Sequence, residues 1–518
     1  MNQSALKFEM TLAQLFDEHQ LSATEAATRI QDIKLDSRQV VPGDLFVALK
    51  GGTFDGTAFI GSAVKRGAVA VLVDENQQEL VNGCGVPVVG LSDIEARLGV
   101  VADRFFQQPS RQLVVVGITG TNGKTSCCHY IAQGLQAADV SCGVIGTLGW
   151  GEIGALKNTG NTTPDVVSVH RMLAHFVAEG YQVVAMEVSS HGLDQGRVNG
   201  VHFETAVFTN LTRDHLDYHG SMRQYGESKR KLFEVAGLQN AVLNVDDHFG
   251  AQLCYSLSSN KPAMKVLGLS SEPAAEVQAQ VRASRVQFDA NGIRARISSP
   301  WGEGILTSPL LGRFNLSNLL AVFSVLCLRG VSMDKALAVI AQLQNAPGRM
   351  QRYGGQTLPL VVVDYAHTPD ALMVALAALR ECCDGQLICV FGCGGDRDKG
   401  KRPEMGKVVE RFSDRLIVTN DNPRSEPEQQ IIDDILSGID DPLKPMICPD
   451  RAQAIQLAVD MATQGDVILV AGKGHENYQE TGASRVAFSD GEQVKQALSL
   501  KLRELQAKLQ NSKPGDDA

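Results

Sequence analysis

Val114-Val115-Val116-Gly117-Ile118-Thr119-Gly120-Thr121-Asn122-Gly123-Lys124-Thr125 is the stretch that decides the fold. Its β-branched apolar run predicts a buried strand, and the glycine-rich turn after it leads into a helix. Backbone N–H groups and a helix N-terminus then face an anion, Lys124 adds positive charge, and the Thr125 hydroxyl can hold Mg²⁺. Glycines at such a turn can be purely structural, but Gly-Lys-Thr there predicts a phosphate site. The usual P-loop requires glycine where this chain has Ile118, so the loop is a variant.

Length and charge indicate a multidomain α/β enzyme. The 518 residues exceed what one hydrophobic core accommodates, and the length predicts three domains, while two or four are also compatible with it. The hydrophobic fraction of 44% and the 50 glycines are ordinary for this class. A net charge of −10, from 58 acidic and 48 basic residues, argues against nonspecific nucleic-acid binding but not against an anionic nucleotide.

The cysteines and the chain start predict a reduced, cytoplasmic location. The eleven cysteines include no C-x-x-C pair, so the sequence gives no support to a zinc or redox site. The start, Met1-Asn2-Gln3-Ser4, lacks a basic segment followed by an apolar one. No run approaches the ~20 apolar residues that span a bilayer. We therefore expect a soluble protein without membrane insertion, and a disordered tail over residues 511–518.

Three successive patterns of strands and helices divide the chain, at residues 1–110, 111–345 and 346–518. The first mixes short strands and helices, with a helix over Ile94–Phe106. In the second and third, strands alternate with helices, which predicts parallel sheets covered on both faces. The strands that we expect besides the P-loop strand are Leu45–Leu49, Ala68–Val73, Val183–Val188, Thr205–Phe208, Asn240–Leu243, Leu360–Asp364, Leu387–Gly392, Arg415–Thr419 and Val467–Gly472.

Polar residues follow two strands of the second pattern, where ligands of such sheets lie. Glu187 could complete a Mg²⁺ shell begun by Thr125, or be a strand-end acid in solvent or at a helix cap, and its position leaves both open. The run Thr209–His219 holds two histidines and two aspartates that could serve as metal ligands or acid–base groups, and His215 is the better candidate. The run Tyr225–Phe233 by itself predicts an amphipathic helix with a solvated basic face.

Three strand ends of the third pattern are polar or rich in glycine. Glycines and cations over 391–403 suit an anionic ligand. In the run 419–424, Arg424 could grip a carboxylate, while Asp421 and Asn422 could accept from an ammonium group. A turn with an exposed arginine is the simpler interpretation of that run alone. With the end at 471–476, three polar ends in one domain favour a binding cleft.

The motifs together resemble those of the ATP-dependent Mur ligases, cytoplasmic amide-bond-forming enzymes of bacterial peptidoglycan synthesis. The resemblance covers nearly the whole chain, in order. It implies three α/β domains: a uridine-nucleotide-binding domain (1–110), a P-loop ATPase-like parallel-sheet domain (111–345) and a Rossmann-like C-terminal domain (346–518). The motifs that carry it are Gly117–Thr125, Glu187–Gly192, Asn210–Asp217 and Asp364–Asp370.

The resemblance also implies ATP as co-substrate, Mg²⁺ as cofactor and catalytic roles for Lys124, Glu187, His215 and Lys229. Lys229 matches a lysine that the family carries as a carbamate, and this modification reverses its interpretation as a solvated cation. Thr125, Glu187, His215 and the Lys229 carbamate would hold the metal. The implied ATP contacts are Gly120, Thr121, Asn122, Gly123, Lys124, Thr125, Ser126, Asn315, Asn318, Arg349 and Asp364.

The implied reaction joins meso-diaminopimelate to the D-Glu carboxylate of UDP-MurNAc-L-Ala-D-Glu, in a monomer. Lysine-adding relatives differ at the motif Asp-Asn-Pro-Arg. Diaminopimelate carries a second carboxylate that lysine lacks, so a buried arginine placed for that carboxylate would be left unpaired by lysine. Thr57 and Ser228 depart from the histidine and alanine of many relatives. The implied sugar-peptide contacts are Leu35, Ser37, Gly52, Thr53, Phe54, Asn161, Thr162, Thr163, Ser189, Gln195 and Arg197. The implied diaminopimelate contacts are Arg397, Asp421, Asn422, Pro423, Arg424, Gly472 and Glu476.

Two other functions are compatible with the P-loop. A folylpolyglutamate synthetase has a variant P-loop and ligase chemistry, but would lack the first domain and the Asp-Asn-Pro-Arg pocket. A nucleotide-dependent switch would hydrolyse ATP without a sugar peptide and signal to a partner.

Overall fold

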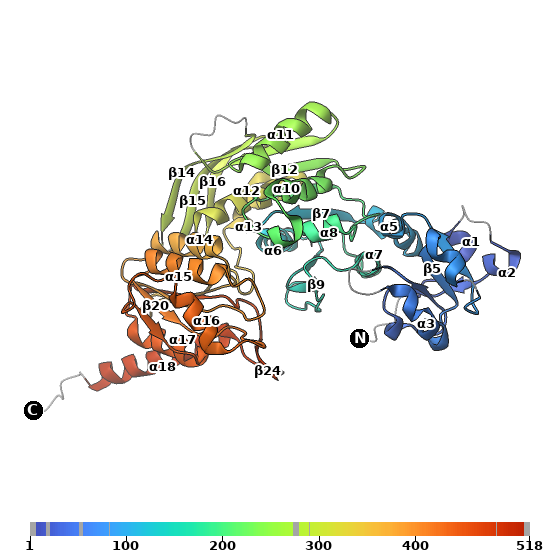
Figure 1. The fold of residues 1–518 in the computed structure, drawn as a ribbon. Helices are drawn as coiled ribbons and strands as arrows, with labels where there is room; N and C mark the ends of the chain where they lie inside the picture. The colour runs from blue at the N-terminus through green and yellow to red at the C-terminus, as the bar shows by residue number, and fades with distance from the viewer. Residues whose placement is uncertain are drawn as a thin grey trace, which may run out of the picture. The chain divides into compact units, whose positions relative to one another are not determined.

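The computed structural model describes residues 7–16, 21–50, 55–81, 83–272, 279–289, 291–482 and 484–511. They form two compact units, Met1–Arg282 with Ala321–Ser332, and Ala283–Leu320 with Met333–Ala518, and each is described by itself (Figure 1). The α/β class is confirmed, and all the expected strands are present, with ends that differ by at most two residues. The borders at 110 and 345 stay predictions.

The N-terminal part of the first unit is built on a parallel sheet in the order β3-β4-β5-β6. Apolar side chains bury these strands, which are β3 Asp32–Lys34, β4 Asp44–Val47, β5 Ala70–Asp74 and β6 Val88–Leu91. The other elements are β1 Met10–Thr11, α1 Leu12–Leu15, α2 Ala23–Ala26, β2 Arg29–Ile30, α3 Ile60–Arg66, α4 Gln78–Val81 and α5 Ile94–Phe105. The predicted helix at 94–106 is thus confirmed.

The P-loop strand β7 (Val114–Thr119) lies between β11 and β10 in a larger sheet with the order β16-β15-β14-β13-β12-β11-β7-β10-β8-β9. From β13 to β8 the strands are parallel, so their carboxyl ends share one edge. The strands are β8 Cys142–Gly146, β9 Gly149–Gly151, β10 Val183–Glu187, β11 Thr205–Phe208, β12 Asn240–Asn244, β13 Lys265–Ser270, β14 Val281–Asp289, β15 Gly292–Ser299 and β16 Gly302–Ser308. The helices are α6 Lys124–Gln136, α7 Val166–Ala178, α8 Ser190–Asp194, α9 Leu216–His219, α10 Met222–Arg230, α11 His248–Asn260, α12 Arg313–Leu328 and α13 Met333–Ile340.

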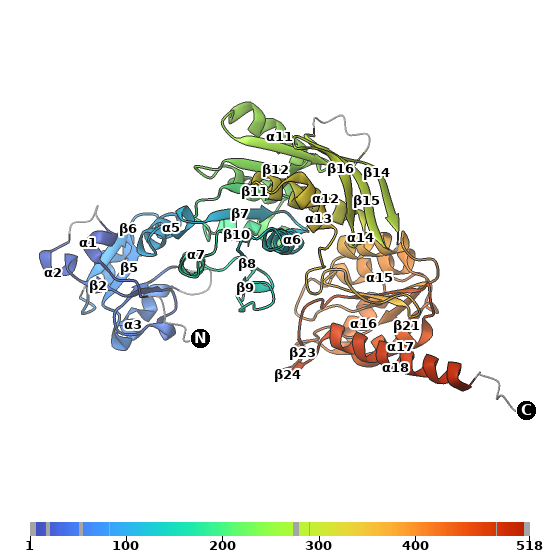
Figure 2. The same ribbon diagram turned by 180° about the vertical axis from the view of Figure 1, so that it is seen from behind.

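The C-terminal sheet of the second unit has the order β17-β18-β22-β19-β20-β21, and only β17 is antiparallel to its neighbour. Its strands are β17 Gln351–Gly354, β18 Leu360–Asp364, β19 Leu387–Phe391, β20 Arg415–Val418, β21 Pro445–Ile447 and β22 Val467–Ala471. A hairpin, β23 Tyr478–Thr481 and β24 Ser484–Ala487, follows β22. The helices are α14 Pro369–Arg380, α15 Lys401–Phe412, α16 Glu428–Leu436, α17 Arg451–Met461 and α18 Asp490–Asn511, of which α17 and α18 lie side by side (Figure 2).

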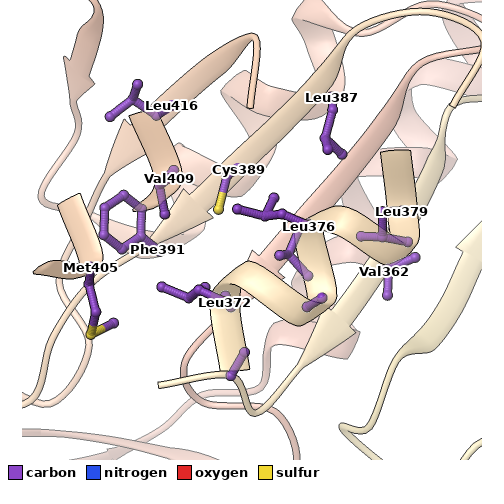
Figure 3. Close-up of a cluster of buried hydrophobic side chains, with 14 of the residues drawn as sticks. Val362, Leu372, Leu376, Leu379, Leu387, Cys389, Phe391, Met405, Val409 and Leu416 are labelled. Atoms are coloured by element: carbon purple, nitrogen blue, oxygen red, sulfur yellow. The ribbon is translucent and has the colours of Figure 1, made fainter. Parts of the chain in front are cut away.

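Strand residues of this sheet alternate between two hydrophobic cores. Val362 packs with Leu372 and Leu376 of α14, whereas Val361 and Val363 pack with α17 and α18. Figure 3 shows the α14 side of the sheet, where leucines of the helix meet Cys389 and Phe391. Because both faces are buried, these strands are continuously apolar rather than alternating.

Other expectations concern single features. All eleven cysteines are free. None of the helices in the described part of the chain is long and apolar enough to cross a membrane. Of the tail expected to be disordered, Asn511 ends α18 and residues 512–518 lie outside the described residues.

A buried carboxyl–imidazole pair joins α5 to α7. The His170 ring donates through Nε2 to the Asn199 carbonyl at 2.9 Å, so its Nδ1 faces Asp103 Oδ1 at 3.5 Å as an acceptor. Gly99 lets the backbones come close here, because a Cβ on it would lie 2.1 Å from Asn199 O. Burial raises the pKa of Asp103 to about 6 and lowers the pKa of His170 to about 4, which favours a neutral pair.

We expect Asp103→Asn to stabilise the first unit at neutral pH. Because folding raises the pKa of Asp103, its contribution is full below the unfolded value of 3.8 and is lost as pH rises through about 6. The neutral amide can donate to His170 Nδ1 at any pH, so the variant should gain about 2 kcal/mol at pH 7 and nothing near pH 4. Thermal melting across this range measures the gain. Glu95→Gln, on the exposed side of the same helix, is the control; an equal gain there would contradict the assignment.

Candidate active site

The variant P-loop begins later than its motif suggests. Ile118, at the position of the missing glycine, is a buried residue of β7 in register with Glu187 of β10 and Val207 of β11. The turn itself needs Gly120 and Gly123, whose φ angles are 150° and 87°. A Cβ on Gly120 would lie 1.9 Å from Thr209 Oγ1. Extending the strand through position 118 therefore shortens the loop, and two glycines suffice.

Lys124 begins α6 and folds back over the loop. Its Nζ donates to the carbonyls of Gly120 and Thr121, each at 2.8 Å. The loop rests on the segment after β11, where the Asn210 carbonyl and its Oδ1 accept from the N–H groups of Thr121 and Asn122. The first turn of α6, which continues into the buried Thr125 and Ser126, supplies backbone N–H groups for a phosphate.

Glu187 lies buried beside the P-loop, not in solvent. Its Oε2 accepts from Thr125 Oγ1 at 2.9 Å. Thr147, which follows β8, donates to the same carboxylate through its N–H at 2.8 Å and its hydroxyl at 3.1 Å. Carboxylate and hydroxyl oxygens suit Mg²⁺, so Thr125 and Glu187 fit the implied metal. Thr147 was missed from sequence, because only the order β8-β10-β7 brings it here.

Lys229 is buried on α10, so the expected solvated basic face is wrong at this residue. Only 1% of it is exposed, and its Nζ donates to Gly120 O at 2.8 Å, the carbonyl that Lys124 also contacts. The pKa of Lys229 lies well below its usual value because of burial and the nearby charge of Lys124. The carboxylate of Asp214 has the opposite effect and raises this pKa. The ring of Tyr225 lies 4.3 Å from Nζ. A neutral amine in this place is the form that can react with CO₂.

His215 stands at the start of α9 with φ 52° and lies near the same loop. Its Nε2 is 3.4 Å from Asp214 Oδ2, and its ring centroid is 4.8 Å from that of His191. Burial lowers the pKa of His215, with Asp214 opposing and Lys124 and Lys229 adding to the shift, which favours the neutral ligand form. In the described ranges, no group of three or more histidine, cysteine, aspartate or glutamate residues could hold a metal. A complete shell thus needs Thr125 and the Lys229 carbamate, and it stays a prediction.

Five of the expected sugar-peptide contacts meet near the end of β10. Thr163 Oγ1 donates to Glu187 O at 3.0 Å and accepts from the Ser189 N–H at 2.9 Å. Arg197 donates to Thr163 O at 2.8 Å and to Gln195 Oε1 at 2.6 Å. Thr162 lies beside the Glu187 contacts, with its Oγ1 3.0 Å from Thr147 Oγ1.

The other expected sugar-peptide contacts are spread along the chain. Asn161 is exposed just before Thr162. Leu35 and the buried Ser37 follow β3, at the carboxyl end of the N-terminal sheet. Gly52, Thr53 and Phe54 lie outside the described residues.

The expected nucleotide contacts of the second unit lie on α12, at the end of β18 and just before β17. Asn315 and Asn318 are buried on α12, with Asn318 Nδ2 donating to Asn315 Oδ1 at 3.3 Å. Asp364 ends β18 and accepts from the N–H groups of Met350 and Ala366. The Arg349 guanidinium lies 4.6 Å from the centroid of the Tyr365 ring.

The expected diaminopimelate contacts gather where β19, β20 and β22 end. Asn422 Nδ2 donates to Glu476 Oε2 at 2.8 Å. Gly472 has φ 115°, and a Cβ on it would lie 2.6 Å from Asp421 Oδ2. Arg424 follows Pro423 with φ 52° and donates to Gly395 O at 2.8 Å. Arg397, on the same glycine-rich segment, is exposed.

Sequence reasoning missed the hairpin β23–β24, which contacts the residues 421–424. Arg424 pairs with Thr481, and its N–H donates to Glu480 O at 3.1 Å. Gln479 Nε2 donates to Asp421 O at 2.8 Å. No polar motif marks the hairpin. Only two short strand-forming segments on either side of Gly482 could have indicated it.

The chain is similar to known proteins over most of its length. The chain is 46% identical over 488 residues to UDP-N-acetylmuramoyl-L-alanyl-D-glutamate–2,6-diaminopimelate ligase of Coxiella burnetii, covering 94% of this chain and 99% of the relative. The chain belongs to the Mur ligase family. Its segments match the Mur ligase family catalytic domain (29–106), the Mur ligase middle domain (118–326) and the Mur ligase glutamate ligase domain (348–474).

Two further Mur ligases align over most of their length. The ligase of the same name from Chromobacterium violaceum is 49% identical over 473 residues, covering 91% of this chain and 94% of the relative. A solved structure with that name superposes with a TM-score of 0.71 at 35% identity, covering 95% of this chain and 99% of its own. The three-domain α/β fold of the Mur ligases is thus the fold of this chain.

We expect Lys229 to form a carbamate with ¹³C-labelled bicarbonate, because burial and the nearby Lys124 charge lower the pKa of its amine. A carbamate carbon signal should appear in the ¹³C spectrum of the wild type and be absent from Lys229→Ala. Lys231→Ala removes a more exposed lysine of the next turn, paired with Asp194, and should keep the signal. A signal that survives in Lys229→Ala would contradict the assignment.

Proposed function

We propose that this Mur ligase joins meso-2,6-diaminopimelate to the γ-carboxylate of D-glutamate in UDP-N-acetylmuramoyl-L-alanyl-D-glutamate, with cleavage of ATP to ADP and phosphate. The full-length identity with ligases of that name carries the proposal. The residues Asp421–Arg424 and Glu476 support it, because they bring a guanidinium and two carboxylates to the carboxyl ends of strands in one sheet. We place the reaction in the cytoplasm, as a step of peptidoglycan precursor synthesis by a monomer.

In the proposed first step, an oxygen of the D-glutamate carboxylate attacks the γ-phosphorus of ATP. The P–O bond to ADP breaks, and an acyl phosphate forms. Lys124 and the N-terminus of α6 offset the negative charge that develops on the phosphates. Thr125, Glu187, His215 and the Lys229 carbamate would hold Mg²⁺, which supplies further positive charge there when bound.

In the proposed second step, the amine of diaminopimelate attacks the acyl carbon, and the tetrahedral intermediate expels phosphate. Arg424 would pair with the carboxylate of the distal amino-acid group, and Glu476 with its ammonium. Thr163, Ser189, Gln195 and Arg197 would hold the sugar peptide. Ser189 caps α8 and Thr163 ties it to β10, so these contacts are set on rigid elements.

The two alternatives make different demands on the chain. A folylpolyglutamate synthetase has no use for a uridine-binding domain, whereas residues 29–106 match a Mur ligase domain. A nucleotide switch needs no amino-acid pocket, whereas strand ends of the second unit form a network of hydrogen-bonded charged groups.

The decisive measurement is phosphate release with UDP-MurNAc-L-Ala-D-Glu, comparing meso-diaminopimelate with L-lysine. We expect release only when the sugar peptide and diaminopimelate are both present, and at least about a hundredfold lower kcat/KM with L-lysine, since lysine lacks the second carboxylate that Arg424 would bind. Hydrolysis of ATP without the sugar peptide would favour the switch, and turnover with a folate would favour the synthetase.

Lys124→Ala should abolish ADP formation while leaving the fold intact. The variant removes the positive charge at the loop, which is expected to lower kcat by at least about a thousandfold. Ser141→Ala, in a turn before β8, is the matched control and should keep wild-type turnover. Undiminished ADP formation in Lys124→Ala would overturn the phosphate role of the loop.

A further inference from the structure

A fully buried lysine lies within the amino-acid pocket of the second unit. Lys473 follows Gly472 at the end of β22, with 0% of its surface exposed. Its Nζ donates to Asn422 Oδ1 at 2.8 Å and to Glu476 Oε2 at 2.9 Å, and lies 5.3 Å from the centroid of the Tyr478 ring. A lysine is almost never buried without partners, and both partners here are expected ligand contacts.

The three side chains form a closed triangle. Asn422 Nδ2 donates to the same Glu476 Oε2 at 2.8 Å, which completes it. The amide of Asn422 is therefore fixed: its oxygen faces the ammonium of Lys473, and its nitrogen faces the carboxylate of Glu476. Both bonds to Glu476 end on Oε2, so in this triangle Oε1 is the oxygen left for a ligand.

The triangle also reaches Arg424 through the hairpin. Asn422 Oδ1 accepts a second hydrogen bond, from the Glu480 N–H at 3.0 Å. Glu480 in turn accepts from the Arg424 N–H through its carbonyl, and its carboxylate lies 3.4 Å from Arg424 Nε. Arg424 has φ 52°, a conformation that needs such support. Rotation of the Asn422 amide would thus disturb the backbone that presents Arg424.

We propose that Lys473 is a positioning residue for the amino-acid substrate. It orients Asn422 and Glu476, so that Glu476 meets the ammonium and Arg424 meets the carboxylate of one amino-acid head group. This role rests on the proposed function. Lys473 also balances the charge of Glu476 through its contact with Oε2.

The test compares Lys473→Met with Lys501→Met. Lys501, on α18 of the same unit, donates to the carbonyls of Val459 and Asp460 at the end of α17, away from these strand ends. Lys473→Met should raise the KM for meso-diaminopimelate by about tenfold to a hundredfold, the effect of losing hydrogen bonds to a charged group. The KM values for ATP and the sugar peptide should stay within about twofold, and Lys501→Met should behave as the wild type.

A second variant separates positioning from bulk stability. In a Glu476→Gln background the carboxylate that Lys473 orients is absent, so adding Lys473→Met should raise the KM much less than it does in the wild type. Equal effects in both backgrounds, an unchanged KM in Lys473→Met, or a rise in all three KM values would overturn the role.

The outcomes also separate this proposal from the proposed function. A wild type that releases no phosphate with diaminopimelate rejects the function itself. A wild type that turns over, beside a Lys473→Met protein that is folded and has an unchanged KM, rejects only the positioning role. If neither Lys473→Met nor Lys473→Gln folds, the lysine serves folding and the positioning role is overturned.

Discussion

The buried contact between Thr125 and Glu187 is the interaction on which the central site depends. It joins the P-loop helix α6 to the end of β10, and Thr147 closes it from the end of β8. The helix and two strands of the sheet thus meet at a single carboxylate. Removing Glu187 would leave two hydroxyl groups and a backbone N–H without their acceptor, and it would take the only carboxylate from the implied metal set.

Around this carboxylate, the electrostatics of the site favour anions. Lys124 and Lys229 both donate to the Gly120 carbonyl, and the charge of Lys124 adds to burial in lowering the pKa of Lys229. Carbamylation of Lys229 would remove this repulsion and add a negative oxygen donor. Glu187 and the Lys229 carbamate would then be among the groups that hold a divalent cation, and Lys124 would remain for the phosphates.

In the second unit, too, polar residues meet at the carboxyl ends of parallel strands, but there they form the candidate amino-acid site. Gly472 and Asp421 follow two strands and meet closely, as the glycine without a Cβ allows. The hairpin then adds backbone hydrogen bonds to the run 421–424, and Lys473 adds a buried cation. The candidate amino-acid site therefore combines the rigid edge of the sheet with the hairpin, which lies outside the sheet.

The strands, the P-loop and the strand-end candidates were predictable, because β-branched runs and glycine-rich turns are local signals. Lys229 was not predictable from its own helix, since a basic residue on an amphipathic helix normally faces solvent; only its resemblance to the family corrected this. Thr147 and the hairpin were missed, because neither carries a local motif. Asp103 and His170 could not be paired either, since their helices are 60 or more residues apart.

By itself, the sequence determined which local elements form, where each strand ends and which chemical groups stand at those ends. The tertiary structure alone decided which ends are neighbours: β8 beside β10, and the hairpin beside Asp421–Arg424. It also decided which charges are buried, as for Lys229 and Lys473. The physical reason is that local propensities depend on adjacent residues, whereas burial and strand order depend on contacts between distant segments.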